Sequence, residues 1–160
     1  MNKFLFLLLL FPIIAIGQIQ EVNSEELLGK LIGQLKNGYG DPEVSLRNKD
    51  DRYVFTYRNR RFDHLRQYGT FQFKCSMDEL DLFFNYLVSN LDSVSRKRRF
   101  IEKTLKIPTG ILQLNFNRRL GNNYVQIMHT PKKIDGLEQL LPINKKQLFK
   151  LFGKQKSFLK

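Results

Sequence analysis

The chain has 160 residues, of which 27 are lysine or arginine and 15 are aspartate or glutamate, giving a formal net charge of +12. Its single cysteine, Cys75, excludes an intramolecular disulfide, so the fold depends on a hydrophobic core, for which 14 phenylalanines and 6 tyrosines provide material. This length fits one domain better than two, and the excess of positive charge favours anionic partners.

The N-terminal segment, residues 1–17, has the pattern of a cleavable export signal. One cation, Lys3, precedes an apolar run, and small residues at positions 15 and 17 precede Gln18. The apolar run has 13 residues, fewer than the roughly 20 that span a bilayer, so a retained membrane anchor is the weaker alternative. We therefore predict cleavage between Gly17 and Gln18.

Cleavage would leave a single domain, residues 18–160, with 26 basic and 15 acidic residues and a charge of +11. We expect it to be periplasmic or secreted, without a transmembrane segment. The lone cysteine is more typical of bacterial export than of small eukaryotic secreted proteins, which usually contain several disulfides. Export also disfavours nucleic acid as the partner.

The first predicted element of this domain is a helix over residues 23–36. Asn23 and Glu26 have the spacing of a capping box, and Leu27, Leu28, Leu31, Ile32 and Leu35 follow at helical spacing. A turn is predicted after Asn37 and Gly38.

Three strands are predicted next, over residues 44–47, 53–58 and 70–75. The first two flank the polar turn at 48–51. In the third, Phe71, Phe73 and Cys75 alternate with polar residues, which predicts one buried face.

A second capping box, Ser76 with Glu79, opens the clearest helix of the sequence. Its apolar residues recur at helical spacing: Leu80, Phe83, Phe84, Leu87, Val88 and Leu91. The segment 99–107 permits a strand. A hairpin over 111–116 and 124–129 follows, and a third capping box at Asn144 predicts a helix through Phe152 that Gly153 ends.

These elements predict an α+β fold, with antiparallel sheets covered on one face by helices. Their order is also that of an α-β-β-β unit present twice, followed by a C-terminal helix. The tripeptide Asn-Arg-Arg occurs at 59–61 and again at 117–119, each time after the second predicted strand of a half. We treat an internal duplication as a hypothesis.

Familiar catalytic and metal-binding motifs do not occur in the sequence. It contains no glycine-rich phosphate loop, HExxH, CxxC or GxSxG. Cys75 could act as a nucleophile beside His64 or His129, but its position on an apolar strand face favours a buried, inert thiol. Neither histidine has further ligands at a familiar spacing, so we predict no metal site and no cofactor.

The basic run Arg96, Lys97, Arg98 and Arg99 directly follows the second predicted helix. Positive charge stabilises the C-terminal end of a helix, but four consecutive cations exceed that need. Arginine forks bind carboxylate, phosphate and sulfate well, so the run is a candidate contact site; the alternative is a solvated surface.

A second set of candidate binding residues comprises Arg60, Arg61, Arg118 and Arg119, which lie beside aromatic residues. Such patterns occur in nucleic-acid platforms, but core-facing strand positions explain the aromatics more simply. We therefore expect an exported, non-enzymatic binding module, of the inhibitor or immunity type, for an acidic protein or anionic polymer. The alternatives are an envelope protein that binds anionic glycans or lipid head groups, and a hydrolase with an unrecognised site.

Overall fold

The computed structural model describes residues 27–62, 66–132 and 136–154. The predicted export signal, its cleavage site and His64 lie outside these residues. The first sheet has the strand order β1 (Lys30–Lys36), β2 (Pro42–Lys49), β3 (Arg52–Arg58) and β4 (Tyr68–Lys74), all antiparallel, with the short helix η2 (Arg60–Phe62) after β3.

The helix α2 (Met77–Ser93) leads from the first sheet to the second. The second sheet contains β5 (Phe100–Ile107), β6 (Gly110–Arg119) and β7 (Asn122–Pro131), and the short strands β8 (Glu138–Gln139) and β9 (Ile143–Asn144) both pair with β7. The helix α3 (Lys145–Leu151) follows directly. The predicted α+β class is confirmed, including the antiparallel sheets and the C-terminal helix.

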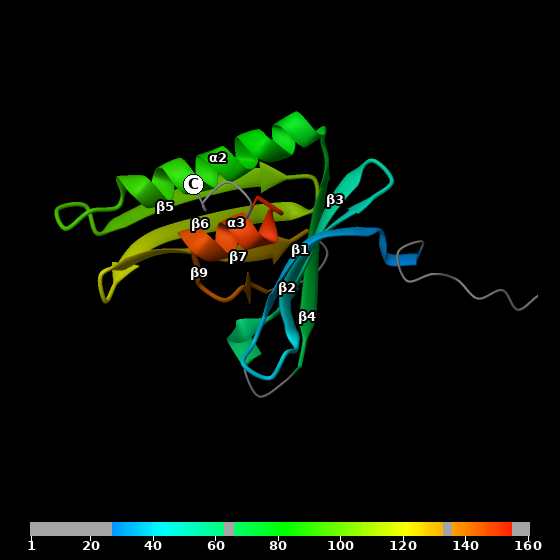
Figure 1. The fold of residues 1–160 in the computed structure, drawn as a ribbon, viewed down its shortest axis with the longest axis horizontal. Coiled ribbons are helices and arrows are strands. Elements are labelled where there is room, and N and C mark those ends of the chain that lie inside the picture. The colour runs from blue at the N-terminus through cyan, green and yellow to red at the C-terminus, as the bar shows by residue number, and fades with distance from the viewer. Residues whose placement is uncertain (1–26, 63–65, 133–135, 155–160) are drawn as a thin grey trace, which may run out of the picture.

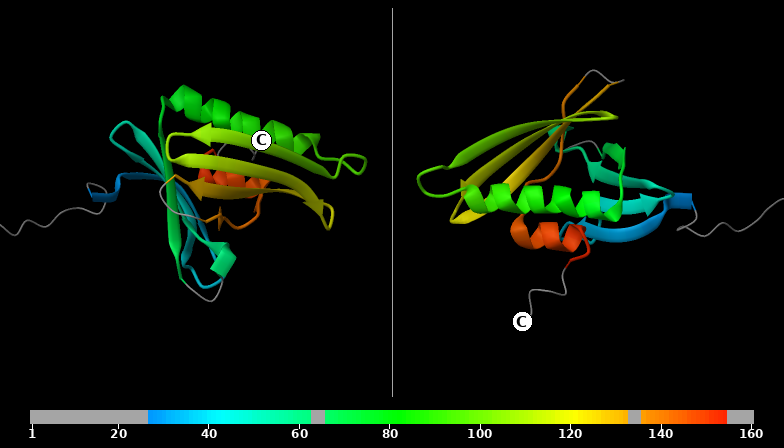
Figure 2. Two further views of the ribbon diagram at one scale, coloured as in Figure 1. Left: turned by 180° about the vertical axis from the view of Figure 1, so that it is seen from behind. Right: turned by 90° about the horizontal axis from the view of Figure 1, so that it is seen from above.

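The two sheets cross steeply, and both helices lie on the same face of the second sheet (Figures 1 and 2). One apolar core joins all four parts. It includes Phe55 and Phe71 from the first sheet, Phe84 from α2 and Phe116 from β6, each at most 4% exposed. Because the same residues bury the sheets and the helices, the described residues share one core.

The two helices begin where the capping boxes predict. The Ser76 hydroxyl accepts from the Glu79 backbone N–H, and the Glu79 carboxylate accepts from the Ser76 backbone N–H. Asn144 and Gln147 make the same reciprocal pair at α3. Gly153, at a positive φ of 68°, follows the last turn of α3, as predicted.

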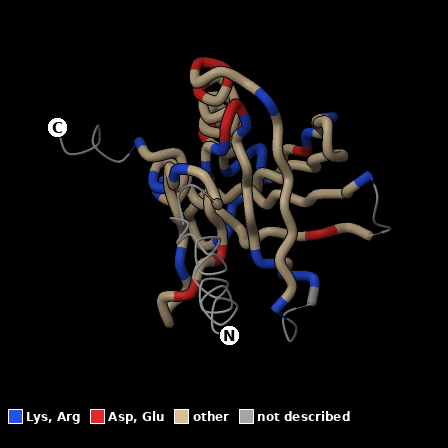
Figure 3. Tube along the Cα trace, turned by 90° about the vertical axis from the view of Figure 1, so that its right-hand side faces the viewer, with Lys and Arg blue, Asp and Glu red and all other residues tan. Residues whose placement is uncertain are grey.

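Charge also connects the helices. α2 carries acidic residues and no basic residue, whereas lysine and arginine are spread over the strands and loops (Figure 3). Lys145 bonds both carboxylate oxygens of Asp92, and Lys154 lies 2.6 Å from Asp81. Part of the large positive charge is therefore paired with acidic residues of the same chain.

The predicted helix over residues 23–36 is wrong over residues 30–36, which form strand β1, whereas Leu27 and Leu28 are helical. The pairing of β1 with β2 shifts register between Leu31 and Gly33, as at a β-bulge. This shift breaks the two-residue alternation of a strand and leaves apolar spacing that imitates a helix. Of the five predicted stripe residues, Leu27, Leu28 and Leu31 are exposed and only Leu35 is fully buried.

The first sheet departs from the predicted α-β-β-β unit, because residues 30–36 add a fourth strand, β1, at its edge. The first Asn-Arg-Arg follows the third strand of its sheet, whereas the second lies at the end of the second strand of its sheet. The two tripeptides are therefore not in equivalent positions.

None of the helices in the described part of the chain is long and apolar enough to cross a bilayer.

Candidate functional site

The basic run predicted from the sequence forms the loop between α2 and β5. Val94 is buried and ends α2, and a tight turn follows, in which the Ser95 backbone N–H donates to the Arg98 carbonyl at 3.0 Å. The Arg98 backbone N–H donates back to the Ser95 hydroxyl at 3.1 Å. This turn leaves Arg96 and Lys97 at its tip, and residues 96–99 are all exposed.

The hairpin between β6 and β7 brings Arg118 and Arg119 to the same end of the second sheet. Phe100 pairs with Asn117, and the Arg118 backbone N–H donates to the carbonyl of Arg99. Both turns lie side by side at one extremity of the molecule (Figures 1 and 2). Two segments separated in sequence therefore meet here through the sheet register.

Asn123, at the start of β7, joins the two turns. Its side-chain amide donates to the carbonyls of Leu91 and Val94, at 2.8 and 3.0 Å, and so satisfies two carbonyls at the end of α2. Its oxygen accepts from the Arg118 guanidinium at 3.4 Å. The sequence around Asn123 gives no local sign of this role, because the residues that it contacts lie about 30 positions earlier in the chain.

We call Arg96, Lys97, Arg98, Arg99, Arg118 and Arg119 the basic end. Arg118 is half-buried and the other five residues are exposed. Among the described residues, no ion pair joins any of the six to a carboxylate. The nearest acidic residue in the preceding helix, Asp92, is already paired with Lys145.

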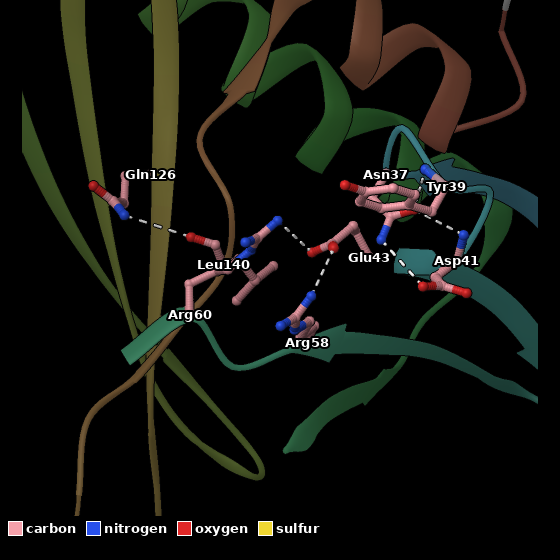
Figure 4. A network of polar contacts seen from close by, with 8 residues as sticks. All are labelled: Asn37, Tyr39, Asp41, Glu43, Arg58, Arg60, Gln126 and Leu140. Carbon is pink, nitrogen blue, oxygen red and sulfur yellow. Dashed lines mark hydrogen bonds and ion pairs between the residues drawn. The ribbon is translucent and has the colours of Figure 1, made fainter. Parts of the chain in front are cut away.

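The other two candidate arginines, Arg60 and Arg61, lie elsewhere, between the first sheet and β8. Arg60 makes a 2.8 Å ion pair with Glu43, a carboxylate only 3% exposed, and Arg58 approaches the same carboxylate at 3.4 Å (Figure 4). Arg61 donates to the carbonyl of Leu137 at 3.3 Å. Both side chains connect parts of the fold: Arg60 neutralises a buried carboxylate, and Arg61 bonds the backbone before β8.

A separate polar cluster lies where the two sheets meet. The Tyr57 hydroxyl, from the first sheet, donates to the Glu138 carboxylate and lies 2.9 Å from His129 Nδ1. His129 and Glu138 are opposite each other on β7 and β8. Gly69, opposite Tyr57, leaves the space for the ring, because a Cβ there would lie 2.6 Å from Tyr57 Cζ.

Burial shifts the pKa values of two members of this cluster. His129 is 1% exposed, and its Nδ1 shares a hydrogen bond with the Tyr57 hydroxyl, which also bonds the Glu138 carboxyl group. Burial lowers the pKa of His129, although Glu138 opposes this. Burial and Glu138 both raise the pKa of Tyr57. Burial thus favours the uncharged forms of both Tyr57 and His129.

Cys75 is not part of that cluster. It follows β4 six residues after Gly69, roughly 20 Å along an extended chain. The thiol is half-buried against the core, and burial, helped by Glu79, raises its pKa. The structure therefore does not bring Cys75 to His129, and a high thiol pKa opposes nucleophilic chemistry.

Within the parts of the chain that the structure describes, no group of three or more histidine, cysteine, aspartate or glutamate side chains could hold a metal ion. No known protein family matches the sequence, and neither curated proteins nor solved structures show a significant similarity to it.

Proposed function

We propose that this protein is a non-enzymatic binding module that engages a polyanionic partner through its basic end. The observation that carries the proposal is the convergence of two turns, which places six cations at one extremity without a carboxylate partner among the described residues. Like charges held together repel one another, so their juxtaposition is favourable when an anion lies between them.

The contrast with Arg60 supports this assignment. Where this fold uses an arginine internally, it provides a buried carboxylate such as Glu43. At the basic end, the side-chain group that the described residues place against a guanidinium is the neutral amide of Asn123. The guanidinium groups there keep donors available for carboxylate, phosphate or sulfate.

Substitution of the basic run tests the proposal. Replacement of Arg96, Lys97, Arg98 and Arg99 by serine should lower the salt concentration at which the purified protein elutes from immobilised heparin, used as a polyanionic probe. The matched control replaces four exposed lysines outside the basic end by serine: Lys30, Lys36, Lys103 and Lys106.

The two variants have the same net charge, so they separate a localised site from the charge of the whole protein. We expect the run variant to elute at clearly lower salt than the lysine variant, with unchanged circular dichroism. Equal elution of the two folded variants would refute a localised site. Loss of fold in the run variant would show that these residues are integrated into the structure, and the exposure argument would then be wrong.

The hydrolase alternative has less support, because Cys75 and His129 lie apart and the side chains of Tyr57 and His129 are buried.

A further inference from the structure

The β6–β7 hairpin contains a residue that its turn geometry disfavours. Arg119 pairs with Asn122, so Leu120 and Gly121 form a two-residue loop, with φ values of 46° and 85°. Positive φ at both positions is the pattern of a type I′ turn, whose first position strongly prefers asparagine, aspartate or glycine. A leucine in this conformation brings its Cβ too close to the following carbonyl oxygen.

The same leucine makes no use of its apolar side chain within the fold. Leu120 is 102% exposed, the highest value among the exposed large hydrophobic residues. Leucine therefore stabilises neither the turn nor the core at this position, and asparagine would make the fold more stable. Unfavourable backbone conformations of this kind are concentrated at binding sites.

The surroundings of Leu120 indicate what it contacts. Arg118 and Arg119 precede it, and the turn of residues 95–99 lies beside it. Phe100, opposite Asn117, is 54% exposed on the same end of the sheet. One carboxylate, Glu102, lies two residues further along β5. An apolar side chain that projects from a narrow extremity, with cations behind it, matches the layering of a bilayer with anionic head groups.

We infer that the basic end docks on an anionic lipid surface, with Leu120 inserted among the acyl chains and the six cations on the head-group phosphates. This inference rests on the proposed function, because it identifies the polyanionic partner as a lipid surface. An acidic protein surface is the less favoured partner, because a stable protein interface needs a broad patch of about 800 Å² on each side, whereas two hairpin-like turns offer a small tip.

Binding to lipid vesicles tests the inference. The intact mass of each purified variant is measured first, to verify that all variants have the same N-terminus. The wild type should sediment with vesicles of phosphatidylcholine and phosphatidylglycerol and not with phosphatidylcholine alone. Leu120→Asn should weaken vesicle binding by about ten-fold or more, as expected for withdrawal of one leucine from an apolar environment. It should also raise the thermal midpoint, because asparagine suits the turn.

The absence of tryptophan from the chain allows a direct reporter. Leu120→Trp should shift its emission to shorter wavelength when phosphatidylglycerol vesicles are added. Tyr39→Trp is the matched control, because Tyr39 is 95% exposed in the turn between β1 and β2, and its emission should not change.

The outcomes separate this inference from the proposed function. If Leu120→Asn binds vesicles as the wild type does, or if the emission of Leu120→Trp stays unchanged, lipid insertion is refuted. If heparin retains the wild type and vesicles do not, the proposed function stands and the partner is a soluble polyanion or an acidic protein. If neither probe binds, both proposals fail.

Discussion

Asn123 is the single side chain on which the geometry of the basic end depends most. Its amide donates to the carbonyls of Leu91 and Val94, two residues that are 1% and 3% exposed, so water has poor access to those carbonyls after a substitution. A net contribution of about 1 kcal/mol for each hydrogen bond gives about 2 kcal/mol for Asn123→Ala. This loss would be a large fraction of the stability of a small domain.

Asn123→Asp makes a sharper test, because the two side chains have nearly the same shape. An aspartate presents an oxygen where the amide donated, and its negative charge faces the negative end of α2. We expect a larger loss than for alanine, about 3 kcal/mol, from two lost donors and added repulsion. Urea denaturation measures both variants, with an unchanged slope as evidence that the denatured state is the same.

Asn122→Ala provides the control at the neighbouring, exposed position, and its stability should change by less than about 0.5 kcal/mol. If Asn123→Ala is as stable as this control, or if Asn123→Asp matches the wild type, then Asn123 does not hold α2 to the hairpin. A folded Asn123→Ala protein should also elute earlier from heparin, although no cation has been removed.

Two further predictions concern titratable groups. Because burial lowers the pKa of His129, the unfolded chain binds more protons than the folded one as the pH falls through about 6.5; stability should therefore decrease from about pH 7.5 to about pH 5.5. His129→Gln should flatten this decrease. If the stability of the variant, measured by urea denaturation, falls with pH as steeply as that of the wild type, the assignment to His129 is wrong. Because burial raises the pKa of Cys75, the folded protein should react with a thiol reagent at neutral pH more slowly than the urea-unfolded protein, and equal rates would show an accessible thiol.

The parts of the fold that sequence patterns predicted are those with local causes. The capping boxes at Ser76 and Asn144 place both helix starts correctly, because the reciprocal hydrogen bonds involve residues only three positions apart. The hairpins are predicted by alternation and turn residues. The failure over residues 30–36 also has a local cause, because the irregular pairing of β1 with β2 removes the alternation.

The candidate site could be predicted only in part. That residues 96–99 are exposed follows from their charge, and the structure confirms it. Their meeting with Arg118 depends on the register of β5 against β6, and the link through Asn123 depends on how α2 packs on β7. Long-range geometry of this kind has no signature in a short stretch of sequence.

The two Asn-Arg-Arg tripeptides show how topology decides what identical residues do. In the first, Asn59 accepts from the backbone N–H groups of Arg61 and Gln139, and Arg60 reaches the buried Glu43 on a neighbouring strand. That carboxylate must be neutralised because it is removed from water.

The second tripeptide lies at the free end of a hairpin. Opposite it are Asn122 and Asn123, which offer amide groups and no carboxylate. The exposed Leu120 follows these arginines in the turn of the hairpin, whereas Arg60 and Arg61 belong to the short helix η2. The same three residues thus hold the fold together at one place and, on our proposal, bind the partner at the other, because Arg60 has the buried Glu43 as its partner whereas the residues opposite Arg118 and Arg119 are asparagines.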